Sequence, residues 1–130
     1  MTSAHLLALG SEAFVSLTTF RRTGIGVSTP VWIARDGDAL VVTTPAPSGK
    51  VKRLRNNPSV TLRPSGRMGH VDPHAPLTMA TAEVVADPAE VQRCSEVLHA
   101  KYGAEYVMIM GIESRFARGR QERVILRITD

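Results

Sequence analysis

The chain has 130 residues, of which 43% are hydrophobic and 22% are charged, as in an ordinary globular protein. This length predicts one domain, residues 1–130, large enough to bury a core. A single cysteine, Cys94, excludes an intramolecular disulfide and a cysteine-based zinc ribbon, so we expect a reducing, cytoplasmic location. No apolar run is long enough to cross a membrane.

Positive charge is concentrated in two stretches of the chain, whose formal net charge is +4. Residues 39–71 contain no acidic residue but include Lys50, Lys52, Arg53, Arg55, Arg63 and Arg67. Near the C-terminus, Glu122 is the only acidic residue among Arg115, Arg118, Arg120, Arg123 and Arg127. Unless they are ordinary solvated surface, these clusters indicate an anionic partner, either nucleic acid or a phosphorylated small molecule.

The first third of the chain predicts β-strands separated by short turns. We expect strands over residues 12–22, 26–35 and 39–44, where Val, Thr and aromatic residues are frequent. Thr23-Gly24 and Asp36-Gly37 are turn signals, and Pro30 indicates a sheet edge or a bulge. Three strands joined in this way predict an antiparallel meander.

A short helix and a longer one are predicted beyond this meander. Residues 48–58, "SGKVKRLRNNP", favour a helix of two or three turns that Ser48 caps and Pro58 ends. Asp87 as N-cap, Glu90 in a capping box and a final Gly103 define the longer helix, which buries Cys94 in its apolar stripe.

Further strands are expected over residues 59–63, 77–86 and 120–128, with a Gly/Pro-rich loop over 63–76. Residues 105–116 are ambiguous. The elements together predict a mainly β fold, a six-stranded antiparallel split β-barrel with one short and one longer helix.

Several kinds of chemistry find no support in the sequence. There is no G-x-S-x-G elbow, no G-x-G-x-x-G and no Walker A motif. His70, Asp72 and His74 could hold a cation, but such a stretch is more often a polar loop, and we expect no metal site. No aromatic residue lies between Lys50 and Arg67, which argues against stacking on nucleic-acid bases.

The stretch around Ser48 has the composition of a phosphate socket. The free N–H groups and the dipole of a helix N-terminus favour an anion. Ser48 adds a hydroxyl, Gly49 permits close backbone approach, and Lys50 supplies charge. Arg53 lies one turn further along the same helical face. The phosphate interpretation is therefore preferred to solvated surface.

Three segments together resemble a known family. "TTFRRTGIGVSTPVWIARDGDALVVTT", "SGKVKRLRNNPSVTL" and "MATAEVV" are similar to the split β-barrel flavin and deazaflavin oxidoreductases, the pyridoxamine 5′-phosphate oxidase-like superfamily. The closer likeness is to its actinobacterial branch, which uses the deazaflavin cofactor F420. The resemblance covers about residues 14–85 and, more loosely, the final strand.

The resemblance implies a homodimer with the cofactor in a groove between subunits. It implies that Lys50, with Ser48, Gly49 and Arg53, holds the cofactor phosphate. The strand along the cofactor ring would be Thr29, Pro30, Val31 and Trp32, although Trp32 could instead be a core residue. Thr43 and Thr44 would flank the ribityl chain.

The function implied is an F420-dependent reductase that transfers a hydride to a small organic substrate, with FMN as the alternative cofactor. The oligoglutamate tail of F420 would account for the surplus basic residues at Arg55 and near the C-terminus. No catalytic residue can be assigned, with Tyr102, Tyr106 and His70 only possible proton donors. A non-catalytic protein that binds a flavin, a deazaflavin or haem stays open.

Overall fold

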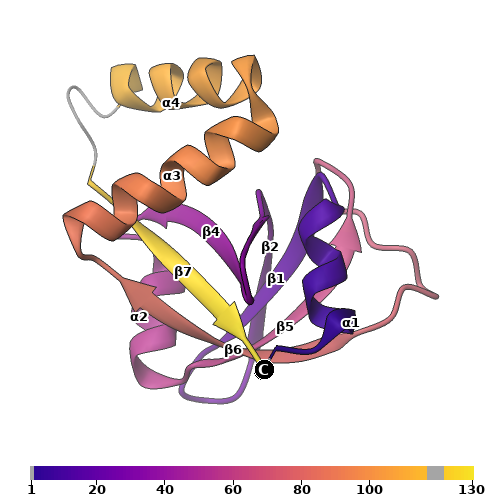
Figure 1. The fold of residues 1–130 in the computed structure, drawn as a ribbon. Helices are drawn as coiled ribbons and strands as arrows, with labels where there is room; N and C mark the ends of the chain where they lie inside the picture. The colour runs from indigo at the N-terminus through magenta and orange to yellow at the C-terminus, as the bar shows by residue number, and fades with distance from the viewer. Residues whose placement is uncertain (1, 117–121) are drawn as a thin grey trace.

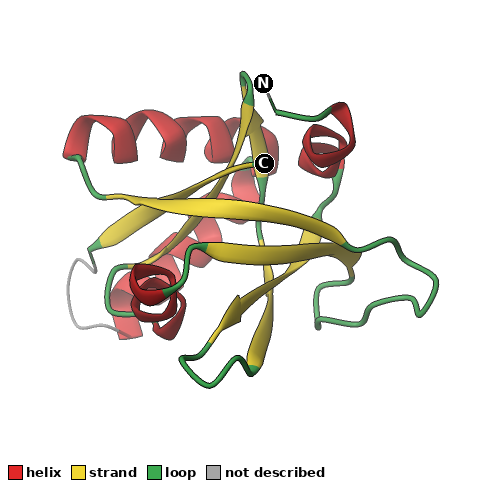
Figure 2. Ribbon diagram, turned by 90° about the horizontal axis from the view of Figure 1, so that it is seen from below, coloured by secondary structure: helices red, strands yellow, loops and turns green. Residues whose placement is uncertain are grey.

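The computed structural model describes residues 2–116 and 122–130, and its strands form one antiparallel sheet (Figure 1). The strands are β1 (Phe14–Phe20), β2 (Gly26–Val31), β3 (Ala34–Asp36), β4 (Ala39–Pro45), β5 (Ser59–Ser65), β6 (Thr78–Val85) and β7 (Arg123–Thr129). Their order in the sheet is β2-β1-β5-β6-β7-β4-β3. Because β2 and β3 follow each other in the chain but end the sheet on opposite sides, the sheet curls into a split barrel, and Figure 2 shows its strands crossing at an angle.

The helices lie around this curled sheet. They are α1 (Ala4–Leu7), continued by a 3₁₀ turn (Ala8–Ser11), α2 (Gly49–Asn56), α3 (Pro88–Tyr102) and α4 (Ala104–Phe116). In Figure 1, α3 and α4 lie above the sheet, α2 lies at its lower left, and α1 lies on the right. None of the helices in the described part of the chain has the length and hydropathy needed to span a membrane.

The predicted mainly β, antiparallel class is confirmed, but the strand count of six is wrong. The sheet has seven strands, because the run predicted as one strand over 26–35 breaks at Trp32 and Ile33. Both antiparallel pairings of the predicted meander are present, β2 with β1 and β3 with β4, but the middle strand is broken and its two halves lie at opposite ends of the strand order. Helices α1 and α4 add to the two that the sequence predicted.

Residues of α3 stabilise the break between β2 and β3. The Ile33 N–H donates to the Tyr102 hydroxyl at 3.0 Å, and Lys101 Nζ donates to the Ile33 carbonyl at 2.6 Å. Ile33 itself is fully buried in the barrel, whereas Trp32 packs on the α3 side. The backbone of the break is therefore hydrogen-bonded without a strand partner.

Two hydrophobic clusters lie on opposite faces of β4 and β7. Leu40, Val42, Leu126 and Ile128 point into the barrel, where the N-terminal leucines also pack. Val41 and Ile125 point the other way and pack against Cys94 and Leu98 of α3. Burial on both faces explains why β4 reads as a continuous apolar run instead of alternating.

The N-cap and the final glycine predicted for the longer helix are confirmed, whereas the Glu90 carboxylate accepts from Arg93 instead of completing a capping box. Asp87 Oδ2 accepts a hydrogen bond from the Glu90 N–H at 3.1 Å, and Gly103 ends the helix at a φ of 59°. Burial raises the pKa of the Cys94 thiol, which agrees with a core residue.

One carboxylate, Asp36, ties three elements together. It accepts two hydrogen bonds from Arg93 of α3, at 2.9 and 2.8 Å, and one from Arg127 of β7 at 2.9 Å. The hydrogen bond from Arg93 is the main reason that the pKa of Asp36 is lowered from 3.8 to about 2. The ionised carboxylate therefore stabilises the contact between β3, β7 and α3.

We expect Asp36→Asn to lower the free energy of unfolding by about 1–2 kcal/mol at neutral pH, after allowance for solvent screening. Because the folded pKa is depressed, this contribution is complete above the ordinary value of 3.8 and is lost as pH falls through about 2. Urea denaturation across this pH range measures the difference. The exposed Glu96→Gln is the control, and an equal effect of both substitutions at every pH would contradict this role of Asp36.

Candidate functional site

The N-terminus of α2 is organised by Ser48, as the sequence predicted. Its side chain is the N-cap and accepts from the Val51 N–H at 3.5 Å. The Thr44 hydroxyl donates to Ser48 Oγ at 3.2 Å, which ties the cap to the end of β4. Val51 and Leu54 bury the opposite side of the helix. The first turn of α2 is therefore fixed on the barrel with its polar side outward.

Three basic side chains gather around this helix, and we name Lys50, Arg53 and Arg123 the cation cluster. Each donates to a threonine hydroxyl: Lys50 Nζ to Thr29 at 3.2 Å, Arg53 Nε to Thr19 at 2.6 Å and Arg123 Nε to Thr43 at 2.9 Å. The hydroxyls come from β2, β1 and β4, so three strands fix the positions of the charges. Thr19 is fully buried and Thr43 nearly so.

Like charges lie close together in the cation cluster. The pKa of Lys50 is lowered, first by burial and then by the positive charges of Arg53 and Arg123. Ion pairs between described residues involve Arg67, Arg93 and Arg127, and none involves Lys50 or Arg53. Guanidinium and ammonium groups beside a helix N-terminus form a donor set that suits an anion with several oxygens, such as a phosphate.

Gly49 leaves room for one of these charges. A Cβ added at Gly49 would lie 2.8 Å from Arg53 Nη1. The Arg53 guanidinium therefore lies over the first turn of α2, where a larger residue would displace it. The lack of a side chain at Gly49 therefore leaves room for the Arg53 guanidinium, in addition to the close approach of a ligand to the backbone.

Of the other residues predicted to bind the cofactor, some lie inside the barrel and some lie at the edge of the sheet. Pro30 lies exposed on β2, which is an edge strand as predicted. The Val31 side chain is buried in the barrel core, so only its backbone is available at the edge. Thr44 is 2% exposed and bonds to the Ser48 cap instead of facing solvent.

Trp32 is not brought to the cation cluster. Its ring stacks on Tyr102 with centroids 4.7 Å apart and on Tyr106 at 5.9 Å, within the second hydrophobic cluster. This placement favours the alternative that Trp32 is a core residue.

Two residues of the site, Thr19 and Arg123, were not predicted from the sequence as parts of it. Arg123 was grouped with the C-terminal basic residues, but the pairing of β4 with β7 places it opposite Pro45, beside α2. Arg127 bonds to Asp36 instead, so these two arginines do not form one patch. Residues 117–121 and the Arg115 side chain lie outside the described residues.

The three possible proton donors, Tyr102, Tyr106 and His70, lie in different surroundings. The Tyr102 hydroxyl accepts from the Ile33 N–H and lies 2.7 Å from the Ala13 carbonyl, so the backbone already engages it. Tyr106 stacks between Trp32 and His99, and His70 is exposed in the loop between β5 and β6. None of the three contacts a member of the cation cluster through an interaction between described residues.

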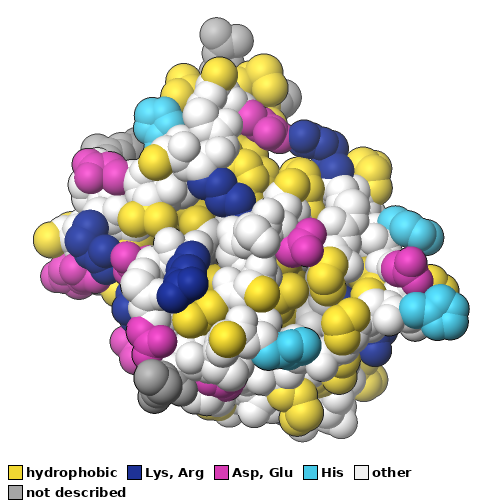
Figure 3. Space-filling model, turned by 45° about the vertical axis from the view of Figure 1, so that its right-hand side comes forward, with side chains coloured by type: hydrophobic (Ala, Val, Ile, Leu, Met, Phe, Trp, Pro, Cys, Tyr) yellow, Lys and Arg dark blue, Asp and Glu magenta, His cyan; other side chains and the backbone are white. Residues whose placement is uncertain are grey.

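The residues that the sequence offered for a metal site do not gather around one point, and one face of the molecule shows no continuous basic patch. Among the described residues, no three His, Cys, Asp or Glu side chains are grouped to hold a metal ion, and Asp72 instead accepts from the His74 N–H at 2.8 Å. On the face shown in Figure 3, basic side chains are scattered among acidic and hydrophobic ones and do not form a continuous patch.

We expect Lys50→Met to raise the free energy of unfolding of the ligand-free protein by about 0.5–1 kcal/mol, because it removes a half-buried charge beside two others. Since the folded pKa of Lys50 is lowered, its destabilising effect is full at neutral pH and fades as pH approaches 10.5. Thermal and urea unfolding at pH 7 and above test this. Lys52→Met, an exposed change on the same helix, should be neutral. A loss of stability on Lys50→Met would show that the bond to Thr29 outweighs the repulsion.

Comparisons with known proteins agree with this fold. The sequence model of the pyridoxamine 5′-phosphate oxidase family matches residues 1–129. No curated protein matches the sequence.

Solved structures resemble the chain at low sequence identity. A conserved hypothetical protein from Mycobacterium tuberculosis is 20% identical, with a TM-score of 0.68 over 98% of this chain and 79% of that one. An F420 reductase is 19% identical, with a TM-score of 0.58 over 98% and 94%. The haem storage protein HutZ from Vibrio cholerae is 13% identical, with a TM-score of 0.67 over 92% and 82%. At these identities the likeness shows the fold alone.

Proposed function

The chain belongs to the pyridoxamine 5′-phosphate oxidase family, and we propose that it binds a phosphorylated flavin-type cofactor at the cation cluster and acts as an oxidoreductase. The preferred cofactor is F420 and the second choice is FMN. The observation that carries the proposal is the convergence of Lys50, Arg53 and Arg123 on the N-terminus of α2 without a carboxylate paired to Lys50 or Arg53 in the described chain.

The hydrogen-bond donors around the N-terminus of α2 suggest a role for each residue of the proposed site. Lys50, Arg53 and the N–H groups of the first turn would hold the phosphate, and Ser48 would keep that turn in place. Thr43 and Thr29 orient two of the cations. The edge of β2 at Thr29–Val31 would border the ring. The cofactor would supply hydride chemistry, while the protein supplies position and charge.

F420 is preferred to FMN for two reasons. One of the structures with the same fold is described as an F420 reductase, at 19% identity. The exposed Arg55 of α2 would also suit an acidic oligoglutamate tail, which FMN lacks. The substrate would be a small organic molecule.

We also propose a homodimer, which the family resemblance implies. Three large hydrophobic side chains, Ile25, Met68 and Met79, are 60%, 91% and 74% exposed. Exposed apolar groups of this size are candidates for a contact between subunits.

A second candidate is a carrier that binds a flavin, a deazaflavin or haem without turnover. It is favoured by the engagement of the Tyr102 hydroxyl with backbone groups, which removes one possible proton donor. Mixing the protein with reduced F420 and a panel of small enones distinguishes the two. Oxidation of the cofactor supports the reductase, and binding without oxidation supports the carrier.

Titration of the protein with F420 and, separately, with FMN tests the binding site itself. We expect saturable binding, followed by cofactor fluorescence, that Lys50→Met weakens at least tenfold, about 1.4 kcal/mol. Lys52→Met controls for the loss of one positive charge from the same helix. If neither cofactor binds, or if both substitutions weaken binding equally, the assignment of the cation cluster fails.

A further inference from the structure

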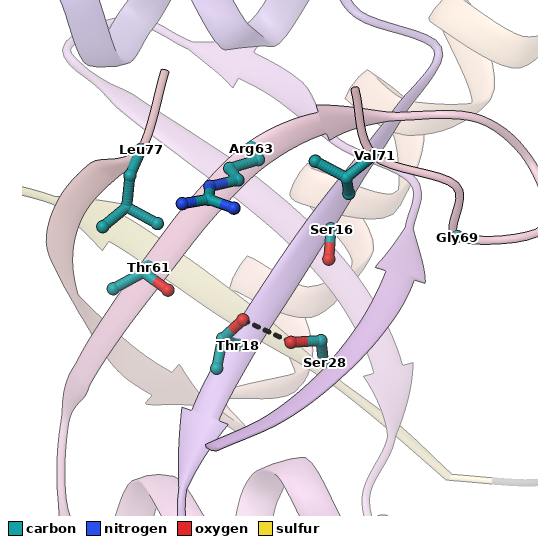
Figure 4. Close-up of a pocket in the computed structure, with 8 residues that line it drawn as sticks. All are labelled: Ser16, Thr18, Ser28, Thr61, Arg63, Gly69, Val71 and Leu77. Carbon is teal, nitrogen blue, oxygen red and sulfur yellow. Dashed lines mark hydrogen bonds between the residues drawn. The ribbon is translucent and has the colours of Figure 1, made fainter. Parts of the chain in front are cut away.

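A pocket of about 350 Å³ lies on the outer face of β1, β2 and β5 (Figure 4). Neighbouring residues on a strand point to opposite faces. Thr18 and Ser28 line the pocket, whereas the adjacent Thr19 and Thr29 bond to the cation cluster. The pocket is therefore separate from the cation cluster, although its Gly69 lies close to Pro30 at the edge of β2.

Hydroxyl groups line the floor of the pocket. In the strand register, Thr18 lies opposite both Ser28 and Thr61. The hydroxyls of Thr18 and Ser28 bond to each other at 2.6 Å. Ser16 and Thr61 make no side-chain hydrogen bond to any other described residue, so both can serve a ligand.

Arg63 is the one charged residue that lines this pocket. It lies opposite Ser16 in the register of β1 and β5. Figure 4 shows its guanidinium between Leu77 on one side and Ser16 and Val71 on the other. Its Nε is buried and has no hydrogen-bond partner among the described residues. A desolvated, unpartnered donor of this kind costs free energy unless an acceptor fills the site.

The rest of the lining defines the kind of acceptor. No carboxylate lines the pocket in the described chain, and Val71 and Leu77 bring apolar side chains from the segment between β5 and β6. Guanidinium groups bind planar carboxylates through paired hydrogen bonds. The volume lies at the lower end of small-molecule sites, which span about 300–1,000 Å³.

We propose that this pocket is a second binding site that takes a small organic carboxylate. Arg63 binds the carboxylate group, Ser16 and Thr61 donate to its oxygens or to a neighbouring polar atom, and Val71 and Leu77 contact the apolar part. The proposal does not depend on phosphate binding, because the pocket and the cation cluster lie on opposite faces of the sheet.

Cinnamate is a suitable probe because it joins a planar carboxylate to an apolar ring, and cinnamamide is its neutral counterpart. Calorimetric titration of the cofactor-free protein should show binding of cinnamate that is at least tenfold tighter than binding of cinnamamide. Arg63→Met should remove that preference, and Arg63→Lys should keep part of it. Arg35→Met, an exposed change on β3, is the control for loss of one charge.

Amide chemical shifts of the wild-type protein test the location without a substitution. Cinnamate should perturb residues 16–18, 28, 61–63 and 69–77 and leave the N-terminus of α2 unchanged. No saturable binding, equal binding of acid and amide, or perturbation centred on α2 would overturn the proposal. So would an Arg63→Met protein that binds cinnamate normally but changes its monomer–dimer equilibrium tenfold in sedimentation, since a second copy would then be the partner of Arg63.

Discussion

Mutual repulsion among Lys50, Arg53 and Arg123 is the constraint around which the proposed function is built. Burial and two neighbouring cations lower the pKa of Lys50, so the fold keeps these charges together at a cost in free energy. Threonine hydroxyls from three strands hold the cations, and no carboxylate of the described chain pairs with Lys50 or Arg53. An anion bound at the N-terminus of α2 would remove that cost. The relief of repulsion would then add to the free energy of anion binding.

Neighbouring residues on the same strands point to opposite faces, so one small sheet can carry both proposed sites. On β1 and β2, Thr19 and Thr29 serve the cation cluster while Thr18 and Ser28 serve the outer pocket. On β4 and β7, the same alternation separates the barrel core from the cluster under α3. The Asp36 carboxylate then fixes α3 to this second face through Arg93 and Arg127.

Local signals in the sequence were sufficient where a feature depends on neighbours in the chain. The Ser48 cap, the two apolar contacts of α2 and the capping of α3 all follow from residues within one or two turns. The mainly β class and the edge position of Pro30 also followed from local composition and from the chemistry of proline. The short α1 could not be predicted, because four residues hold little intrinsic helical preference and their leucines pack in the barrel.

Features that depend on strand register or on distant side chains could not be predicted. The break at Trp32 and Ile33 gives no sequence signal, because both residues are apolar and the partners of Ile33 come from α3. Arg123 joins Lys50 and Arg53 only through the pairing of β4 with β7, and the sequence alone placed it in a different cluster. Arg63 was likewise predicted only as one of the basic residues of 39–71, and the burial of its Nε depends on strands that are distant in the chain.

The most direct test of the central claim is to compare each cofactor with a form of it that lacks the phosphate. FMN should bind at least tenfold tighter than riboflavin, and F420 should show a similar preference over its unphosphorylated deazaflavin core, each measured by fluorescence titration. Equal affinities within either pair would show that the cation cluster does not recognise the phosphate, and would contradict the account given for Lys50, Arg53 and Arg123.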